Sequence, residues 1–202
     1  MGLPGINFAP ADIAPAEFFG EWLSKQVEPL KPLLGVLGDQ SATMSIRVTG
    51  DDGGEWSCTV NKDGLTIKEG LSEEAEVTVI LSTPDFQRAV SGALPMAGSR
   101  AGRKRPSPEE APGLIENALE QLRQVAGQLR YRIEDPAGDF MVDVKFAGPL
   151  KDDPDVEVIM SRETAEGIAG GSLNPQTAFM AGQVQIQGDI SLLMQLMPLM
   201  GA

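Results

Sequence analysis

Few residues in this sequence could carry out covalent or acid–base chemistry. It contains no histidine and a single cysteine, Cys58, so the commonest general base and the commonest metal ligand are both missing. Cys58 lies in the apolar stretch EWSCTV. With no imidazole to activate it, we interpret it as a small hydrophobic residue rather than a nucleophile. Serine or cysteine catalysis of the usual kind is therefore not expected.

Clusters of charge suggest loops rather than reactive sites. The acidic pairs Asp51-Asp52, Glu73-Glu74 and Asp152-Asp153 stand at expected turns, whereas calcium or magnesium sites need several convergent oxygens. The basic run from Arg100 to Arg105 could meet a phosphate or a lipid headgroup, but its position between proline-rich segments favours a linker. We expect no metal site, no cofactor and no enzymatic activity.

The overall composition limits the possible partners. Hydrophobic residues make up 42% of the chain and charged residues 22%, which is typical of a globular protein. The formal net charge of −13 argues against nucleic acid and against general attraction to anionic membranes. We find no signal peptide, and no apolar run approaches the roughly 20 residues that span a bilayer. We expect a cytoplasmic protein without stable membrane insertion.

The segment from Asp189 to Met200 is the most unusual part of the sequence. At about 100° per residue, an α-helix here places only Ser191, Gln195 and Pro198 on one narrow stripe. The rest of the circumference, roughly 220°, is apolar, whereas a surface helix needs an apolar stripe of only about 100°. This excess predicts that a ligand, another part of the chain or a partner covers the helix.

The elements that must position this helix can be traced from the hydrophobic pattern. A helix is expected over 16–37, kinked or broken by its prolines, and then a β-meander with strands near 44–48, 55–60, 65–70 and 76–82. Ser82-Thr83-Pro84-Asp85 predicts a helix start and Gly92 its end. A helix over Gly113–Leu129 and further strands follow. The last elements are a short helix from Asn174 to Met180, a strand over 182–188 and the final helix, capped by Asp189.

The chain contains two similar halves. EVTVILS at 76–82 matches DVEVIMS at 155–161, and the same alignment makes Trp56 equivalent to Phe140. We divide the chain into an N-terminal arm (1–14), a first repeat (15–97), a linker (98–112) and a second repeat (113–202). The first repeat lacks the last strand and helix, and the second has lost part of its middle hairpin, so one merged sheet or one shared cavity is plausible.

This order of elements resembles the sterol carrier protein 2 family. The resemblance covers most of the chain and is most specific in the second repeat, where Val156–Ser161, Gly171–Leu173, Ala178-Phe179, Gly182 and Ile186–Asp189 match the family pattern. It implies an α/β (α+β type) fold, with a largely antiparallel sheet and helices packed on one face. It also implies an apolar tunnel for sterols, fatty acids or acyl-CoA, with the C-terminal helix as part of its lid.

We therefore predict a non-enzymatic carrier of a hydrophobic small molecule. The side chains expected to line the cavity are Trp56, Phe86, Phe140, Phe179, Ile190, Leu193, Met194 and Met197. A plain core or a dimer contact explains the same residues almost as well. The alternatives are a structural, dimerisation or accessory module of a biosynthetic complex, with a homodimer or enzyme partner, and an enzyme that uses a buried carboxylate such as Asp85 or Glu163.

Overall fold

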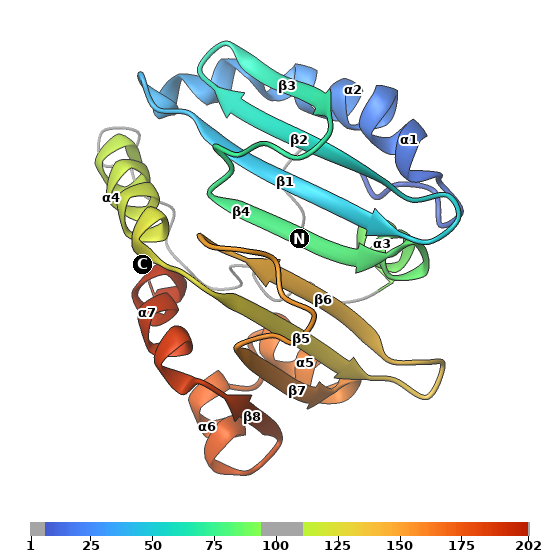
Figure 1. The fold of residues 1–202 in the computed structure, drawn as a ribbon, viewed down its shortest axis with the longest axis vertical. Coiled ribbons are helices and arrows are strands. Elements are labelled where there is room, and N and C mark those ends of the chain that lie inside the picture. The colour runs from blue at the N-terminus through green and yellow to red at the C-terminus, as the bar shows by residue number, and fades with distance from the viewer. Residues whose placement is uncertain (1–6, 94–110, 202) are drawn as a thin grey trace.

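The computed structural model describes residues 7–93 and 111–201 and contains one mixed sheet of eight strands (Figure 1). The strand order is β3-β2-β1-β4-β6-β5-β7-β8, and five of the seven neighbouring pairs are antiparallel. The N-terminal half contributes α1 (Pro15–Glu17), η1 (Phe18–Trp22), α2 (Leu23–Val27), η2 (Glu28–Leu37), β1 (Ala42–Thr49), β2 (Gly54–Asn61), β3 (Gly64–Glu69), β4 (Val77–Ser82) and α3 (Thr83–Val90). The C-terminal half contributes α4 (Ala111–Gln124), β5 (Gln128–Glu134), β6 (Phe140–Lys145), β7 (Val156–Ser161), α5 (Arg162–Ala169), α6 (Pro175–Met180), β8 (Val184–Gly188) and α7 (Ile190–Gly201).

One face of the sheet is apolar across the strands of both halves, because side chains alternate between faces along each strand. Ile46 on β1 stands beside Trp56 on β2 and Val79 on β4. Val79 in turn faces Val144 on β6, which faces Leu129 on β5. Buried side chains of η1, α3, α5 and α7 pack against this face in two clusters. The expected mixed α/β fold, with helices on one face of a largely antiparallel sheet, is confirmed.

The two halves share one pattern of strand pairing. In each, a central strand is antiparallel to the next strand in the chain and parallel to a later one: β1 with β2 and β4, β5 with β6 and β7. An acidic side chain before the later strand accepts a backbone N–H bond in both cases, Glu76 from Thr43 at 2.7 Å and Asp155 from Gln128 at 2.8 Å. This correspondence supports the two-repeat interpretation, which stays a prediction.

The pairing of β4 with β6 joins the halves into one sheet. In the C-terminal half, β7 has the antiparallel strand β8 on its outer side. In the described part of the N-terminal half no strand takes this place, and β4 pairs instead with β6, from Thr78 opposite Lys145 to Leu81 opposite Val142. The outer edge of β6 is free for this because residues 146–155 form no strand of their own. The merged sheet that the sequence made plausible is therefore formed.

The helix expected over Gly113–Leu129 is shorter than predicted. It ends at Gln124, and Leu129 is a buried residue of β5. Gly127 explains the break: its φ of +127° is one that residues with a side chain rarely adopt, and a Cβ there would lie 3.1 Å from the Leu192 side chain.

The expected equivalence of Trp56 and Phe140 is also wrong, because the strand pairing places the two residues at different positions of their hairpins. Trp56 faces Ile46, and the corresponding residue of β5, Tyr131, faces Val142 rather than Phe140. The turn between β5 and β6 is one residue longer than that between β1 and β2, so a comparison of sequence alone shifts the register. Phe140 faces Ile133 instead.

Aromatic rings fill the core of the N-terminal half. Phe19 stacks on Trp56 with ring centroids 4.7 Å apart, and Phe86 contacts Phe18 at 5.2 Å and Phe19 at 5.7 Å. The neighbours Phe18 and Phe19 are both buried, in a segment where η1 is a π-helical turn (Phe18–Trp22). Such single turns are uncommon within helices.

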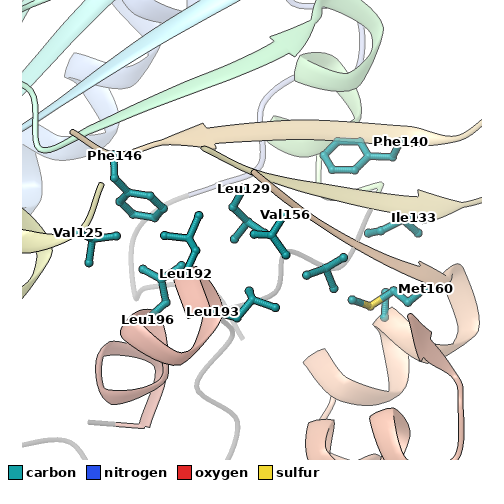
Figure 2. Packing of buried hydrophobic residues seen from close by; sticks show 12 residues of the cluster. Val125, Leu129, Ile133, Phe140, Phe146, Val156, Met160, Leu192, Leu193 and Leu196 are labelled. Atoms are coloured by element: carbon teal, nitrogen blue, oxygen red, sulfur yellow. The ribbon is translucent and has the colours of Figure 1, made fainter. Parts of the chain in front are cut away.

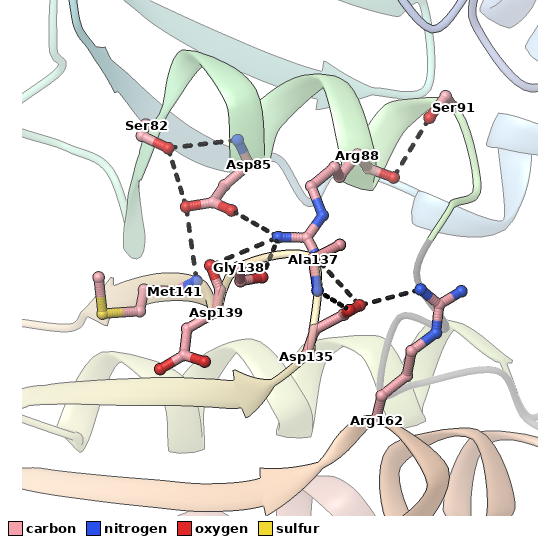
Figure 3. A network of polar contacts seen from close by, with 10 residues as sticks. All are labelled: Ser82, Asp85, Arg88, Ser91, Asp135, Ala137, Gly138, Asp139, Met141 and Arg162. Carbon is pink, nitrogen blue, oxygen red and sulfur yellow. Dashed lines mark hydrogen bonds and ion pairs between the residues drawn. The ribbon is translucent and has the colours of Figure 1, made fainter.

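A buried carboxylate ties the halves together beside the sheet (Figure 3). Asp135, in the turn before β6, accepts from Arg88 of α3 at 3.0 Å and from Arg162 of α5 at 2.9 Å, and its side chain is only 4% exposed. Arg88 also donates to the carbonyl oxygen of Gly138, and Arg162 to that of Ala93. The backbone N–H of Ala137 and these two arginines lower the pKa of Asp135 from its ordinary value of 3.8.

Phe86→Ala tests the aromatic cluster. Its side chain is 3% exposed, and removing a buried phenyl ring leaves a cavity, so we expect a loss of about 3–5 kcal/mol in the free energy of unfolding. Urea denaturation measures it. Phe8→Ala, which removes a ring that is 70% exposed, is the matched control and should change stability far less; equal losses would contradict the packing described.

Asp135→Asn tests the link between the halves. A carboxyl whose pKa is lowered by folding stabilises the protein above its unfolded pKa, and this contribution is lost as the pH falls through the lowered value. The variant should therefore be less stable at pH 7 and lose less stability on acidification below about pH 4. Thermal unfolding from pH 2.5 to 7 measures both effects. Asp139→Asn, at a more exposed ion pair with Arg132, is the control; identical pH profiles for this variant and Asp135→Asn would contradict the assignment.

Candidate functional site

The expected cavity-lining residues fall into three groups that the fold keeps apart. Trp56 and Phe86 belong to the aromatic cluster of the N-terminal half. Phe140 and Leu193, which are 3% and 9% exposed, belong to the cluster under the C-terminal half of the sheet (Figure 2). Those of the eight side chains that the structure describes are therefore distributed over separate clusters and the surface.

The third group is exposed and lies on α6 and α7. Phe179, Ile190 and Met194 are 46%, 51% and 60% exposed. Met180, which the sequence analysis did not include, is 81% exposed. We call these four side chains the apolar rim. The side chain of Met197 lies outside the described part of the structure.

The final helix has one buried and one exposed face. Leu192, Leu193 and Leu196 pack into the C-terminal cluster with partners that include Phe146 and Val156, as Figure 2 shows. Ile190 and Met194 point elsewhere and stay exposed. The sequence predicted that this helix has more apolar surface than the rest of the chain covers. The arrangement fits that prediction, because part of the apolar surface of the helix remains in contact with solvent.

In the sequence, strand β8 lies between α6 and α7, the two helices that carry the apolar rim. Val184 and Ile186 lie on the same face as Met160 and Val158 of β7, with which they pair. Both pack against the C-terminal cluster but are only half-buried. The face of the sheet that the helices cover is thus more exposed at β8 than at β7. The helices before and after β8 in the chain, α6 and α7, carry the apolar rim.

The start of α7 is fixed tightly to β7. The backbone N–H of Asp189 donates to the carbonyl oxygen of Asp155 at 2.7 Å, and the Asp189 carboxylate caps the helix by accepting from the N–H of Ser191. The Ser191 hydroxyl and N–H lower the pKa of Asp189. Gly188 has a φ of +96°, and a Cβ there would stand 2.3 Å from the Asp155 carbonyl oxygen, so no other residue fits this junction.

An open pocket of about 700 Å³ lies where β7 ends and β8 begins. Side chains and backbone from β7, α5 and the segments before α6 and β8 line it, among them Met160, Glu163, Ser172, Gln183 and Gln185. Sequence reasoning missed this pocket because glycine-, serine- and glutamine-rich connections carry no hydrophobic pattern. A smaller pocket of about 230 Å³ adjoins the start of α7 near Asp155 and Leu192.

The described residues offer little reactive chemistry. Burial raises the pKa of the Cys58 thiol to about 11, so it stays protonated near neutral pH. Burial also raises the pKa of Tyr131. Within residues 7–93 and 111–201, no group of three or more histidine, cysteine, aspartate or glutamate side chains is placed to hold a metal ion. In the same ranges, none of the helices combines the length and the hydropathy needed to cross a bilayer.

Comparison with solved structures finds several sterol carrier proteins. The sterol carrier protein domain 2 of Helicoverpa armigera is 30% identical over 46% of this chain and 78% of its own, with a TM-score of 0.33. Palmitated SCP2L2 from Aedes aegypti is 21% identical over 44% and 95%, with a TM-score of 0.33. A UbiJ-SCP2 ubiquinone synthesis protein is 16% identical over 56% and 90%, with a TM-score of 0.31.

The match to a known family concerns the half that carries the apolar rim and the larger pocket. No curated protein sequence matches the chain. The profile of the SCP-2 sterol transfer family, however, matches residues 109–201, from just before α4 to the end of α7. Through this C-terminal half, the chain belongs to the SCP-2 sterol transfer family.

Proposed function

We propose that the C-terminal half binds a lipid at the apolar rim, between α6, β8 and α7. The observation that carries this proposal is the exposure of four large apolar side chains on α6 and α7, the helices that precede and follow the half-buried strand β8 in the chain. A ligand that covers them gains about 25 cal/mol for each Å² of apolar surface removed from water. Membership of this half in a sterol transfer family supports the same conclusion.

The N-terminal half acts as a scaffold in this proposal. Its core is occupied by the stacked rings of Phe19, Trp56 and Phe86, which take the space that a ligand would need. Its contribution is β4, which covers the free edge of β6. Trp56 and Phe86, which we expected to line the cavity, are assigned to this scaffold, and the proposed binding residues are the four of the apolar rim, Phe179, Met180, Ile190 and Met194.

Solubilisation is the mechanism that these residues support. The ligand leaves water for an apolar surface, and among the described residues no group of three or more histidine, cysteine, aspartate or glutamate side chains is placed to hold a metal ion. We therefore propose a carrier rather than an enzyme, with the sequence-based assignment to the cytoplasm kept as a prediction. The third alternative, a catalytic carboxylate, gains no support from Asp85, whose Oδ1 lies 3.4 Å from an amino group of Arg88.

A second candidate function rests on the same exposed side chains. A structural or accessory module would cover the apolar rim with a second copy of this chain or with an enzyme partner, since large exposed apolar patches mark interaction sites. Lipid binding is favoured because the SCP-2 sterol transfer family profile matches the half that carries the rim.

The double substitution Phe179→Ser/Met194→Ser tests the proposal. Both side chains are about half exposed or more, so stability should change little, while affinity for an apolar dye such as Nile red should fall about tenfold. A tenfold loss corresponds to roughly 55 Å² of apolar contact at 25 cal/mol per Å². Fluorescence titration of the full chain measures the affinity.

Leu114→Ser/Met141→Ser is the matched control, because these side chains are 51% and 45% exposed at sites away from the rim. It should bind Nile red like the unaltered protein. Equal losses in both variants, or no binding by the unaltered protein, would contradict lipid binding at the rim. Sedimentation of the same proteins tests the second candidate: a dimer that only the rim variant disrupts, without dye binding, would favour the module.

A further inference from the structure

Strand β8 forms one edge of the sheet (Figure 1). It pairs with β7, from Val156 opposite Gly188 to Met160 opposite Val184, and within residues 7–93 and 111–201 no strand pairs with its other side. An unpaired edge presents backbone N–H and C=O groups to which a further strand can bond, and these main-chain bonds supply affinity when a strand is added to a sheet. The outer side of β8 is therefore a candidate interaction surface.

The opposite edge of the sheet, β3, is protected in ways that β8 is not. β3 carries Lys68 and Glu69, and charged side chains on an edge strand oppose pairing with another chain. The helix η2 packs beside β3, and a Cβ on Gly64 would stand 3.1 Å from the Lys31 side chain. The sequence of β8, VQIQG, contains neither a charged residue nor a proline. Its side chains thus do not oppose the pairing that those of β3 oppose.

The segment around β8 is free of charge over a long stretch of the sequence. No aspartate, glutamate, lysine or arginine occurs between Glu166 and Asp189, although these residues make up 22% of the chain. Because each chain has a formal net charge of −13, two copies repel each other when charged surfaces meet. This repulsion is weakest where the neutral segment of one copy meets that of another. A cationic partner, in contrast, finds nothing here to attract it, so the charge distribution favours a second copy as the occupant.

The side chains of β8 are also compatible with an antiparallel copy of themselves. Gln185 and Gln187 are exposed on one face, and Val184 and Ile186 are half-buried on the other. Directly opposite residues of an antiparallel pair point to the same face. A pairing centred on Gln185 therefore places Gln183 opposite Gln187 of the second copy and Val184 opposite its Ile186. Amide groups both donate and accept, and each apolar pair covers side chains that a single copy leaves half-buried.

We propose that β8 pairs antiparallel with β8 of a second copy of this chain across a two-fold axis, so that the two eight-stranded sheets continue as one. Backbone groups of β8 make this contact, so the inference stands whether or not the apolar rim binds a lipid. It also differs from the accessory module considered above, in which the rim itself is the interface.

Sedimentation velocity and amide hydrogen exchange of the full chain test the inference together. The chain should form a dimer. Exchange of β8 amides should slow as the concentration rises through the dimerisation range, because the pairing adds hydrogen bonds there, while exchange of β3 amides should not change. A monomer at every concentration up to about 0.1 mM, or a dimer in which β8 amides are not protected, would overturn the inference.

The double substitution Gln185→Lys/Gln187→Lys locates the contact. Both side chains are exposed, so the fold should be kept, while like charges facing each other across the axis should weaken the dimer at least about tenfold. Gln185→Glu/Gln187→Glu should weaken it in the same way. An equal mixture of the two variants should form a dimer again, because opposite charges then face each other. A dimer that persists in both variants, or that does not return in the mixture, would contradict the pairing.

Thr66→Lys is the matched control at the other edge. Thr66 and Lys68 are both exposed on β3, so the substitution gives that strand two exposed lysines, as in the β8 variant. It should leave the dimer unchanged, and an equal loss of dimer would show that β8 is not the specific contact. Loss of the dimer in Phe179→Ser/Met194→Ser alone would place the interface at the rim and overturn the pairing of β8.

Discussion

An unpaired strand edge is the constraint on which this structure depends, because buried backbone N–H and C=O groups must find partners. β4 has no later strand of its own half beside it, and in the chain no strand follows β6 before β7 begins. Each half leaves open one edge that the other half closes. The antiparallel pairing of Thr78 to Leu81 with β6 turns two incomplete layers into one sheet.

The two halves share one face of the joined sheet but differ in how completely that face is covered. The row of apolar side chains continues across the junction, from Val79 to Val144, so both clusters lie on one face. On the N-terminal side this face is packed with aromatic rings. On the C-terminal side it ends at the half-buried β8 beside exposed side chains of α6 and α7. The face is thus closed by packed rings in the N-terminal half and more exposed at the C-terminal end of the sheet.

Much of the fold could be predicted from local pattern. Alternation in β1 and β4 identified the strands, and Ser82 caps α3 by accepting from the N–H of Asp85, as its sequence indicated. The end of α4 could not be predicted in the same way. Partly buried Leu122 and buried Val125 and Leu129 continue a helical spacing. The spacing does not reveal that Gly127 has a positive φ, beside Asp155 and Leu192, and this conformation keeps a helix from continuing to Leu129.

The candidate site was less accessible to prediction than the fold. The sequence showed that α7 is apolar over most of its surface, but not which side chains would face inward, because Leu193 and Met194 differ only through tertiary packing. The larger pocket depends on how Gln183, Gln185 and α5 meet at the end of β7. The spacing of residues along the chain does not indicate that these segments come together. The absence of lysine and arginine after residue 162, in contrast, can be read directly from the sequence.

The order of the strands in the chain has a consequence for biosynthesis. A ribosome adds about 5–20 residues per second, and domains usually fold as they emerge. β4 (Val77–Ser82) is made well before its partner β6 (Phe140–Lys145), so its outer edge waits for several seconds without a neighbour. During that interval the nascent N-terminal half exposes a template for unwanted pairing with other chains, and the speed of translation between β4 and β6 sets how long this exposure lasts.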